Sequence, residues 1–190
     1  MGRNMSKKIC LFGHRKILVK IQQLKDNLKL EIEKWVNNGF KTVLIGTHGQ
    51  FDALVLSVCN ELKKIYLDLK IYVVFTSMAS LKKDKNGFSN IDCFKFVNTC
   101  LYPVEEEHFK RKITASNKMM VDESDIVICY VNPQIKRSGA RTAMNYAIKR
   151  NRVVINLYDE NLELLYGKSK EQLDIEFKKY LNYMKEILNN

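Results

Sequence analysis

Short apolar runs rich in β-branched residues alternate with longer segments of helical periodicity along most of this chain. The apolar runs predict five strands, at residues 7–12, 41–46, 70–76, 125–131 and 152–158. The periodic segments predict helices at residues 17–37, 51–69, 111–123 and 138–149. Strands that are apolar along their whole length are covered on both faces, and their alternation with helices implies right-handed crossovers. The sequence therefore predicts the α/β class: a three-layer Rossmann-like domain with a mainly parallel sheet of about five strands.

The whole chain, residues 1–190, is expected to form a single domain, because no internal repeat or domain-separating linker is visible. Its core should span residues 7–158, and an amphipathic C-terminal helix should follow at 168–190. The polar segment 77–109 has weak periodicity and is expected to be a long excursion, of the kind that lies over a site.

Five cysteines are present, an odd number, and none forms a close Cys-x-x-Cys pair: Cys10, Cys59, Cys93, Cys100 and Cys129. Reduced thiols are therefore expected, with no disulfide framework, metal site or cofactor. No apolar stretch approaches the roughly 18 residues that span a bilayer, and the N-terminal apolar run is too short for a signal peptide. We expect a cytoplasmic protein without membrane contact.

The net charge of +11 favours an anionic partner, such as a phosphorylated small molecule or a nucleic acid. Basic residues are spread along the chain without a block of five or six, and they do not interleave with aromatic residues along one strand face. The distribution therefore favours a small anionic ligand over a nucleic acid.

In a parallel sheet of this kind, ligands bind outside the carboxyl ends of the strands, near the reversal of strand order. The stretch "CLFGHRK" ends the first predicted strand with Gly13, His14 and Arg15. Glycine allows close approach of the backbone, and a guanidinium beside exposed amides makes an anion seat. We therefore expect these three residues to contact a ligand.

The segment "GTHGQFD" follows the second predicted strand and supplies Gly46, Thr47, His48, Phe51 and Asp52. Asp52 has two alternative roles: it accepts hydrogen bonds from a ribose or a base, or it caps the helix that begins there. Phe51 is a candidate ligand contact, although a core position is the commoner role of such a residue.

The segment after the fourth predicted strand opens a helix with small and hydroxyl-bearing residues, whose amides could face a phosphate. Its candidate ligand residues are Ser138, Gly139, Arg141 and Thr142. The spacing matches neither the P-loop nor the Gly-x-Gly-x-x-Gly pattern. The acidic residues within 119–125 lie at the opposite end of a strand, so we expect them to be structural.

Taken in order, "CLFGHRK", "GTHGQFD", "SNKMMVDESDIVICYVN" and "SGARTAMNYAIKRNRVVINL" resemble the YpsA-like family of unknown function. That family belongs to the SLOG superfamily of Rossmann-like proteins, related to LOG and DprA, and the resemblance covers residues 8–157. It implies a nucleotide or nucleotide-derived ligand, and it adds Asn117 to the candidate contacts. In LOG-type hydrolases a glutamate stands where this chain has Asn145, and an amide cannot cycle a proton as a carboxylate does.

Three functions follow from these residues. The leading hypothesis is binding or sensing of a nucleotide-like molecule without catalysis, with phosphate on Arg15 and the nearby amides, Asp52 on ribose or base, and His48 closing over the ligand. The alternative is hydrolysis of a nucleotide N-glycosidic bond, with Asp52 as the catalytic carboxylate and His48 assisting. Single-stranded nucleic-acid binding ranks third. Self-association is also expected, through the apolar faces of the helix around Trp35 and of the C-terminal helix.

Overall fold

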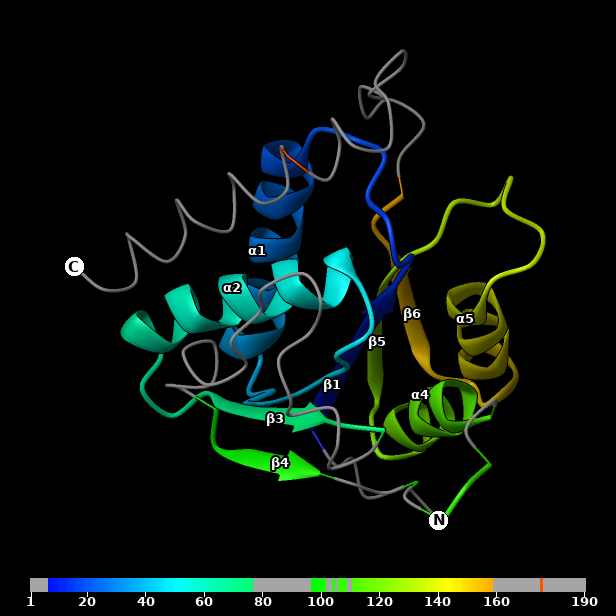
Figure 1. Ribbon diagram of the computed structural model, residues 1–190. Helices are drawn as coiled ribbons and strands as arrows, with labels where there is room; N and C mark the ends of the chain where they lie inside the picture. The colour runs from blue at the N-terminus through cyan, green and yellow to red at the C-terminus, as the bar shows by residue number, and fades with distance from the viewer. Residues whose placement is uncertain are drawn as a thin grey trace.

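A computed structural model describes residues 7–76, 97–101, 104, 106–108, 111–158 and 175. Six strands form one sheet in which every neighbouring pair is parallel, in the order β4-β3-β2-β1-β5-β6 (Figure 1). Their bounds are β1 Lys8–Gly13, β2 Thr42–Ile45, β3 Lys70–Val74, β4 Thr99–Leu101, β5 Ile126–Tyr130 and β6 Val153–Asn156. The predicted fold class is confirmed, and each of the five predicted strands is present.

Helices cover both faces of the sheet, so the fold has three layers. Figure 1 shows α1 (Ile21–Asn37) and α2 (Gln50–Ile65) on the left of the sheet, with α4 (Lys112–Asp122) and α5 (Gly139–Lys149) on the right. Alternate residues along the strands face the two layers: Ile9 and Leu11 pack with α1 and α2, whereas Cys10 and Phe12 pack with α4 and α5. This double burial is the reason why the interiors of the central strands β1, β2 and β5 are apolar on both faces.

The helix predicted from residue 17 begins four residues later, at Ile21. Ile17 and Val19 are buried, so they continue the apolar pattern of the helix without belonging to it. The amide of Ile17 donates to the side-chain oxygen Oε1 of Gln50, at 2.8 Å, instead of entering a helix. A tertiary contact therefore sets the start of α1.

The short strand β4 is a difference from the predicted sheet, because it lies within the segment expected to be an excursion. It extends the sheet at the edge of β3, where Tyr72 pairs with Thr99. Three residues are too few to produce a recognisable alternation of apolar and polar positions. The rest of segment 77–109, apart from 97–98, 104 and 106–108, lies outside the described residues, as does the predicted C-terminal helix apart from residue 175.

Cys10, Cys59 and Cys129 are buried free thiols, in line with the expectation of reduced cysteines. The described part of the chain contains no group of three His, Cys, Asp or Glu side chains placed to hold a metal ion. Of the helices that the structure describes, none has the length and apolar character needed to span a membrane.

Candidate functional site

The loops that follow β1 and β2 lie in direct contact at the carboxyl edge of the sheet. The amide of Gln50 donates to the carbonyl oxygen of Arg15 at 2.9 Å. Gly49 lies so close to the same backbone that a Cβ atom there would be 2.6 Å from Cα of Arg15. The structure thus brings together two of the three segments that the sequence indicated.

The loop after β5 joins this edge through His14. The imidazole nitrogen Nε2 of His14 accepts a hydrogen bond from the amide of Asn132 at 2.8 Å, and the His14 amide donates to the carbonyl of Tyr130 at 3.1 Å. Burial holds the pKa of His14 below its usual value. An imidazole that accepts at Nε2 is neutral, with its proton on Nδ1. The sequence analysis placed His14 among the ligand contacts, whereas in the structure its Nε2 is already used by the amide of Asn132.

Gly13 and Phe51 pack against each other at the end of β1. A Cβ atom on Gly13 would lie 2.6 Å from the ring of Phe51, so the missing side chain makes room for that ring. Phe51 is 0% exposed and stacks on Tyr130, with ring centroids 5.8 Å apart and an interplanar angle of 18°. This pair belongs to the core, and Phe51 offers no exposed surface to a ligand in this arrangement.

Asp52 lies on the first turn of α2, directly after the loop that follows β2. Its Oδ2 accepts a hydrogen bond from the amide of His48 at 2.7 Å. A Cβ atom on Gly46 would lie 2.9 Å from the same oxygen, so glycine at that position leaves space for the carboxyl group. Burial raises the pKa of Asp52 from its ordinary value of 3.8 to about 6, and the hydrogen bond from His48 opposes that rise. Asp52 therefore holds the loop backbone in place. This is close to the capping role that the sequence offered, except that the carboxyl group binds the amide of His48, which precedes α2.

Thr47 and His48 each carry a buried polar atom without a hydrogen-bond partner in the described part of the molecule: Oγ1 of Thr47 and Nε2 of His48. Burial, and secondly the positive charge of Arg15, lower the pKa of His48. Arg15 itself is exposed. We refer to Arg15, Thr47, His48 and Asp52 as the carboxyl-edge cluster. It contains a guanidinium, together with a hydroxyl and a neutral imidazole that each have one atom without a hydrogen-bond partner among the described residues.

The residues that open α5 use their polar groups among themselves. Oγ of Ser138 accepts from the amide of Arg141 at 3.1 Å, and the hydroxyl of Thr142 donates to the carbonyl of Ser138 at 3.1 Å. The guanidinium of Arg141 donates to the carbonyl of Pro133 at 2.9 Å. Gly139 is exposed, and a Cβ atom there would meet nothing within 4 Å. Among these residues, the structure describes no hydrogen bond to the carboxyl-edge cluster.

Asn117 lies in the middle of α4, on the opposite face of the sheet from α2. Figure 1 shows α4 beside the end of the sheet at which β5 begins. The structure describes no side-chain hydrogen bond between Asn117 and the carboxyl-edge cluster, which lies on elements packed against the other face of the sheet.

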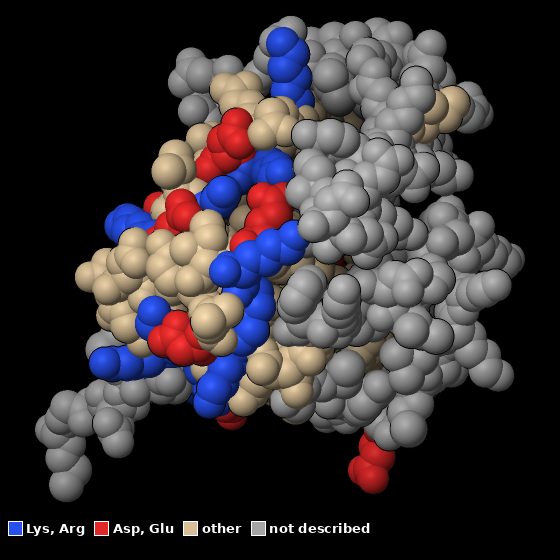
Figure 2. All heavy atoms as spheres, turned by 90° about the vertical axis from the view of Figure 1, so that its left-hand side faces the viewer, with Lys and Arg blue, Asp and Glu red and all other residues tan. Residues whose placement is uncertain are grey.

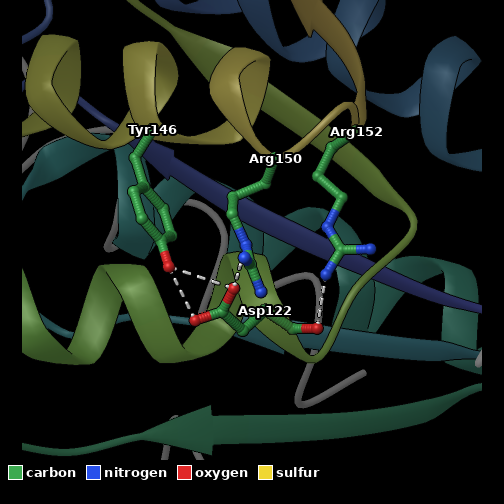
Figure 3. Close-up of polar contacts among 4 residues, drawn as sticks. All are labelled: Asp122, Tyr146, Arg150 and Arg152. Atoms are coloured by element: carbon green, nitrogen blue, oxygen red, sulfur yellow. Dashed lines mark hydrogen bonds and ion pairs between the residues drawn. The ribbon is translucent and has the colours of Figure 1, made fainter.

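The acidic residues before β5 make structural contacts, as expected. Figure 3 shows Asp122 accepting hydrogen bonds from the Tyr146 hydroxyl, at 2.9 and 3.1 Å, and from Nε of Arg150, at 2.9 Å. Nη2 of Arg152 donates to the backbone carbonyl of Asp122 at 2.6 Å. These contacts tie the end of α4 to the end of α5.

Two polar residues of this edge escaped the sequence analysis. Gln50 bridges the first two loops through its amide and its side chain, and Asn132 connects the third loop to His14. The signal in the sequence is weak, because each residue acts mainly through its backbone amide, a group that every residue except proline carries.

Searches of protein-family models and of curated proteins each find no match for this chain. The all-parallel sheet and its alternating helices give a Rossmann-like α/β fold.

Proposed function

We propose that this protein binds a small anionic molecule of the nucleotide class at the carboxyl ends of β1 and β2. The observation that carries this proposal is a pair of buried atoms, Oγ1 of Thr47 and Nε2 of His48, that have no hydrogen-bond partner among the described residues. The positive charge of the exposed Arg15 acts on the same imidazole. A buried polar atom without a partner lowers stability by about 1–3 kcal/mol, so such atoms in a native protein call for an explanation. A ligand that accepts from the hydroxyl and contacts the imidazole would complete both.

The role of each residue follows from its contacts. Arg15 attracts the anion and contacts its phosphate, and Thr47 and His48 complete their hydrogen bonds on the same group. Asp52 contributes by holding the backbone of His48, because one of its oxygens is already used there. Contacts from Ser138, Gly139, Arg141 and Thr142 would require a ligand that reaches across β1 toward α5.

The ordered motifs that resemble the YpsA-like family support the same proposal, since that resemblance implies a nucleotide-derived ligand in a Rossmann-like fold. We further propose that the protein belongs to the SLOG superfamily, is cytoplasmic and self-associates.

A nucleic-acid partner has less support. Figure 2 shows acidic and basic side chains interleaved on the face of the molecule that it displays. Ion pairs join Lys25 to Glu61, at 2.7 Å, and Lys41 to Asp68, at 3.4 Å. A binding face for a polyanion carries clustered positive charge, and the described residues on the face in Figure 2 mix both signs of charge instead.

The proposal is tested by thermal unfolding in the presence of nucleoside monophosphates, NAD fragments and cyclic dinucleotides. A ligand at about 100 times its Kd stabilises the protein by about 2.7 kcal/mol, which raises the melting temperature by several degrees. Arg15→Ala should lose most of this increase. Arg111→Ala is the matched control, because Arg111 is 75% exposed and lies at the start of α4. Failure of every compound to bind the wild type, or undiminished binding by Arg15→Ala, would refute the proposal.

One observation favours a hydrolase as the second candidate. Asp52 is a buried carboxyl group whose pKa of about 6 suits proton transfer near neutral pH, and it is bonded to the backbone of His48. Incubation with nucleoside monophosphates should then release free base, detectable by chromatography, and Asp52→Asn should abolish the release. The absence of free base after long incubation would exclude this candidate.

A further inference from the structure

Thr47 and His48 are consecutive residues of the short loop between β2 and α2, and both of their unpartnered atoms are buried. The hydrogen bond between the His48 amide and Asp52 fixes the backbone between the two residues and α2. The hydroxyl of Thr47 can donate a hydrogen bond, and so can Nε2 of a neutral imidazole in the tautomer that carries its proton there. A compact group with several acceptor oxygens therefore offers a partner to each of the two atoms. A phosphoryl group has that shape and number of acceptors.

The charged groups around His48 favour an anion. Arg15 approaches from the loop after β1 and acts on His48 through its positive charge, whereas Asp52 approaches from α2 and bonds to its backbone. A guanidinium and a hydroxyl are the usual partners of phosphoryl oxygens, and charge-assisted bonds to phosphate are about twice as strong as neutral ones. A ligand with two negative charges on one phosphorus would therefore bind more tightly than a ligand with one.

The aromatic side chains that the structure describes close to the carboxyl-edge cluster are buried and offer no platform for a base. Phe51 is 0% exposed, Phe75 is 1% exposed and Tyr130 is 2% exposed. Tyr158 is partly exposed and packs against Tyr130. It follows β6, and in the sheet β1 and β5 lie between β6 and β2, the strand that leads into the loop of Thr47 and His48. Stacking on an aromatic ring gives about 1–3 kcal/mol per base where it occurs, and the described residues at the cluster offer no exposed ring for it.

From these three observations, and resting on the proposed function, we propose that the site recognises a terminal phosphate monoester through Thr47, His48 and Arg15 and does not distinguish the base. The ligand class is then a sugar phosphate or nucleoside monophosphate, with most of the affinity carried by the phosphate.

Isothermal titration of the full chain with four compounds tests the proposal: ribose 5-phosphate, AMP, adenosine and 3′,5′-cyclic AMP. Ribose 5-phosphate should bind within about tenfold of AMP, because the base adds little. Adenosine, which lacks phosphate, should show no binding. Cyclic AMP is a diester with a single negative charge and should bind at least about tenfold more weakly than AMP.

Thr47→Val removes the hydroxyl while keeping the branched shape of the side chain. The affinities for AMP and for ribose 5-phosphate should both fall by at least about tenfold, as for a lost hydrogen bond to a charged group. The melting temperature of the free variant should equal or exceed that of the wild type, because an unpartnered hydroxyl is removed. Thr42→Val is the matched control, since Thr42 lies at the opposite end of β2.

The outcomes separate the two proposals. If none of the four compounds binds and the wider panel also fails, the proposed function is wrong. If AMP binds but adenosine or cyclic AMP binds equally well, or if Thr47→Val binds as tightly as the wild type, the phosphate-monoester proposal is wrong while the proposed function stands.

Discussion

At the scale of single residues, Gly13 is constrained by its neighbour and not by its backbone conformation. A Cβ atom there would lie 2.6 Å from the fully buried ring of Phe51, which has no free space to move into. We expect Gly13→Ala to lower the free energy of unfolding by about 1–3 kcal/mol, as overpacking of a core does. Urea unfolding measures this value. Gly139→Ala is the control, because a Cβ atom there meets nothing within 4 Å, and equal stability of the two variants would contradict the packing argument.

Asp52 should make stability depend on pH. Its pKa is about 6 in the folded protein and near 3.8 when exposed, so the folded state holds this proton more tightly than the unfolded state. The contribution is fully present below about pH 4 and is lost as pH rises through 6. The difference of about two pKa units corresponds to roughly 3 kcal/mol. Between pH 4 and 7, the wild type should lose about that much unfolding free energy relative to Asp52→Asn, measured by denaturant unfolding at each pH. Parallel pH profiles of the two proteins would refute this prediction.

At the scale of elements, the contacts of Asp122 connect the ends of α4 and α5 (Figure 3). Asp122 and Arg150 are partly exposed, so solvent weakens their attraction. We expect Asp122→Ala to lower the free energy of unfolding by about 1 kcal/mol, and the melting temperature by roughly 2–4 °C. Asp122→Asn keeps an acceptor for Tyr146 and should lose less. A melting temperature unchanged in Asp122→Ala would show that the contacts do not stabilise the helix pair.

At the scale of the whole molecule, the strand order decides which loops meet. β1 lies between β2 and β5, so the loop after β1 contacts both of its neighbours, through Gln50 on one side and Asn132 on the other. His14 follows β1 and contacts Asn132 after β5, and the order of the strands reverses between these two neighbours. Ligands bind near such a reversal in sheets of this type. The fold thus places the carboxyl-edge cluster, at the ends of β1 and β2, next to that point.

The prediction of the fold from sequence succeeded where the pattern was long and failed where it was short. Leu24, Leu28 and Ile32 are buried at helical spacing in α1, and the interiors of β1, β2 and β5 are runs of buried apolar residues. The three residues of β4 gave no such signal. The start of α1 was also missed, because Ile17 is buried outside the helix and its amide donates to the side chain of Gln50, 33 residues away in the chain.

The candidate site was predicted in outline only. The sequence placed Arg15, His48 and Asp52 at strand ends, and the structure brings these three residues together. It also named His14 and Phe51 as candidate ligand contacts, and the roles of both depend on neighbours that a single sequence does not identify. The state of an imidazole depends on its hydrogen-bond partners and burial, and these arise from distant segments.

By itself, the sequence determined the α/β class, the parallel sheet, and the edge at which polar residues gather, because the periodicity and apolarity of each segment are local properties of the chain. Only the tertiary structure decided that Asp52 supports the loop and that Phe51 fills the space left by Gly13. It also decided that Oγ1 of Thr47 and Nε2 of His48 are buried without a partner among the described residues. Those properties are set by burial and by contacts between segments far apart in the chain, which become definite only once the chain has folded.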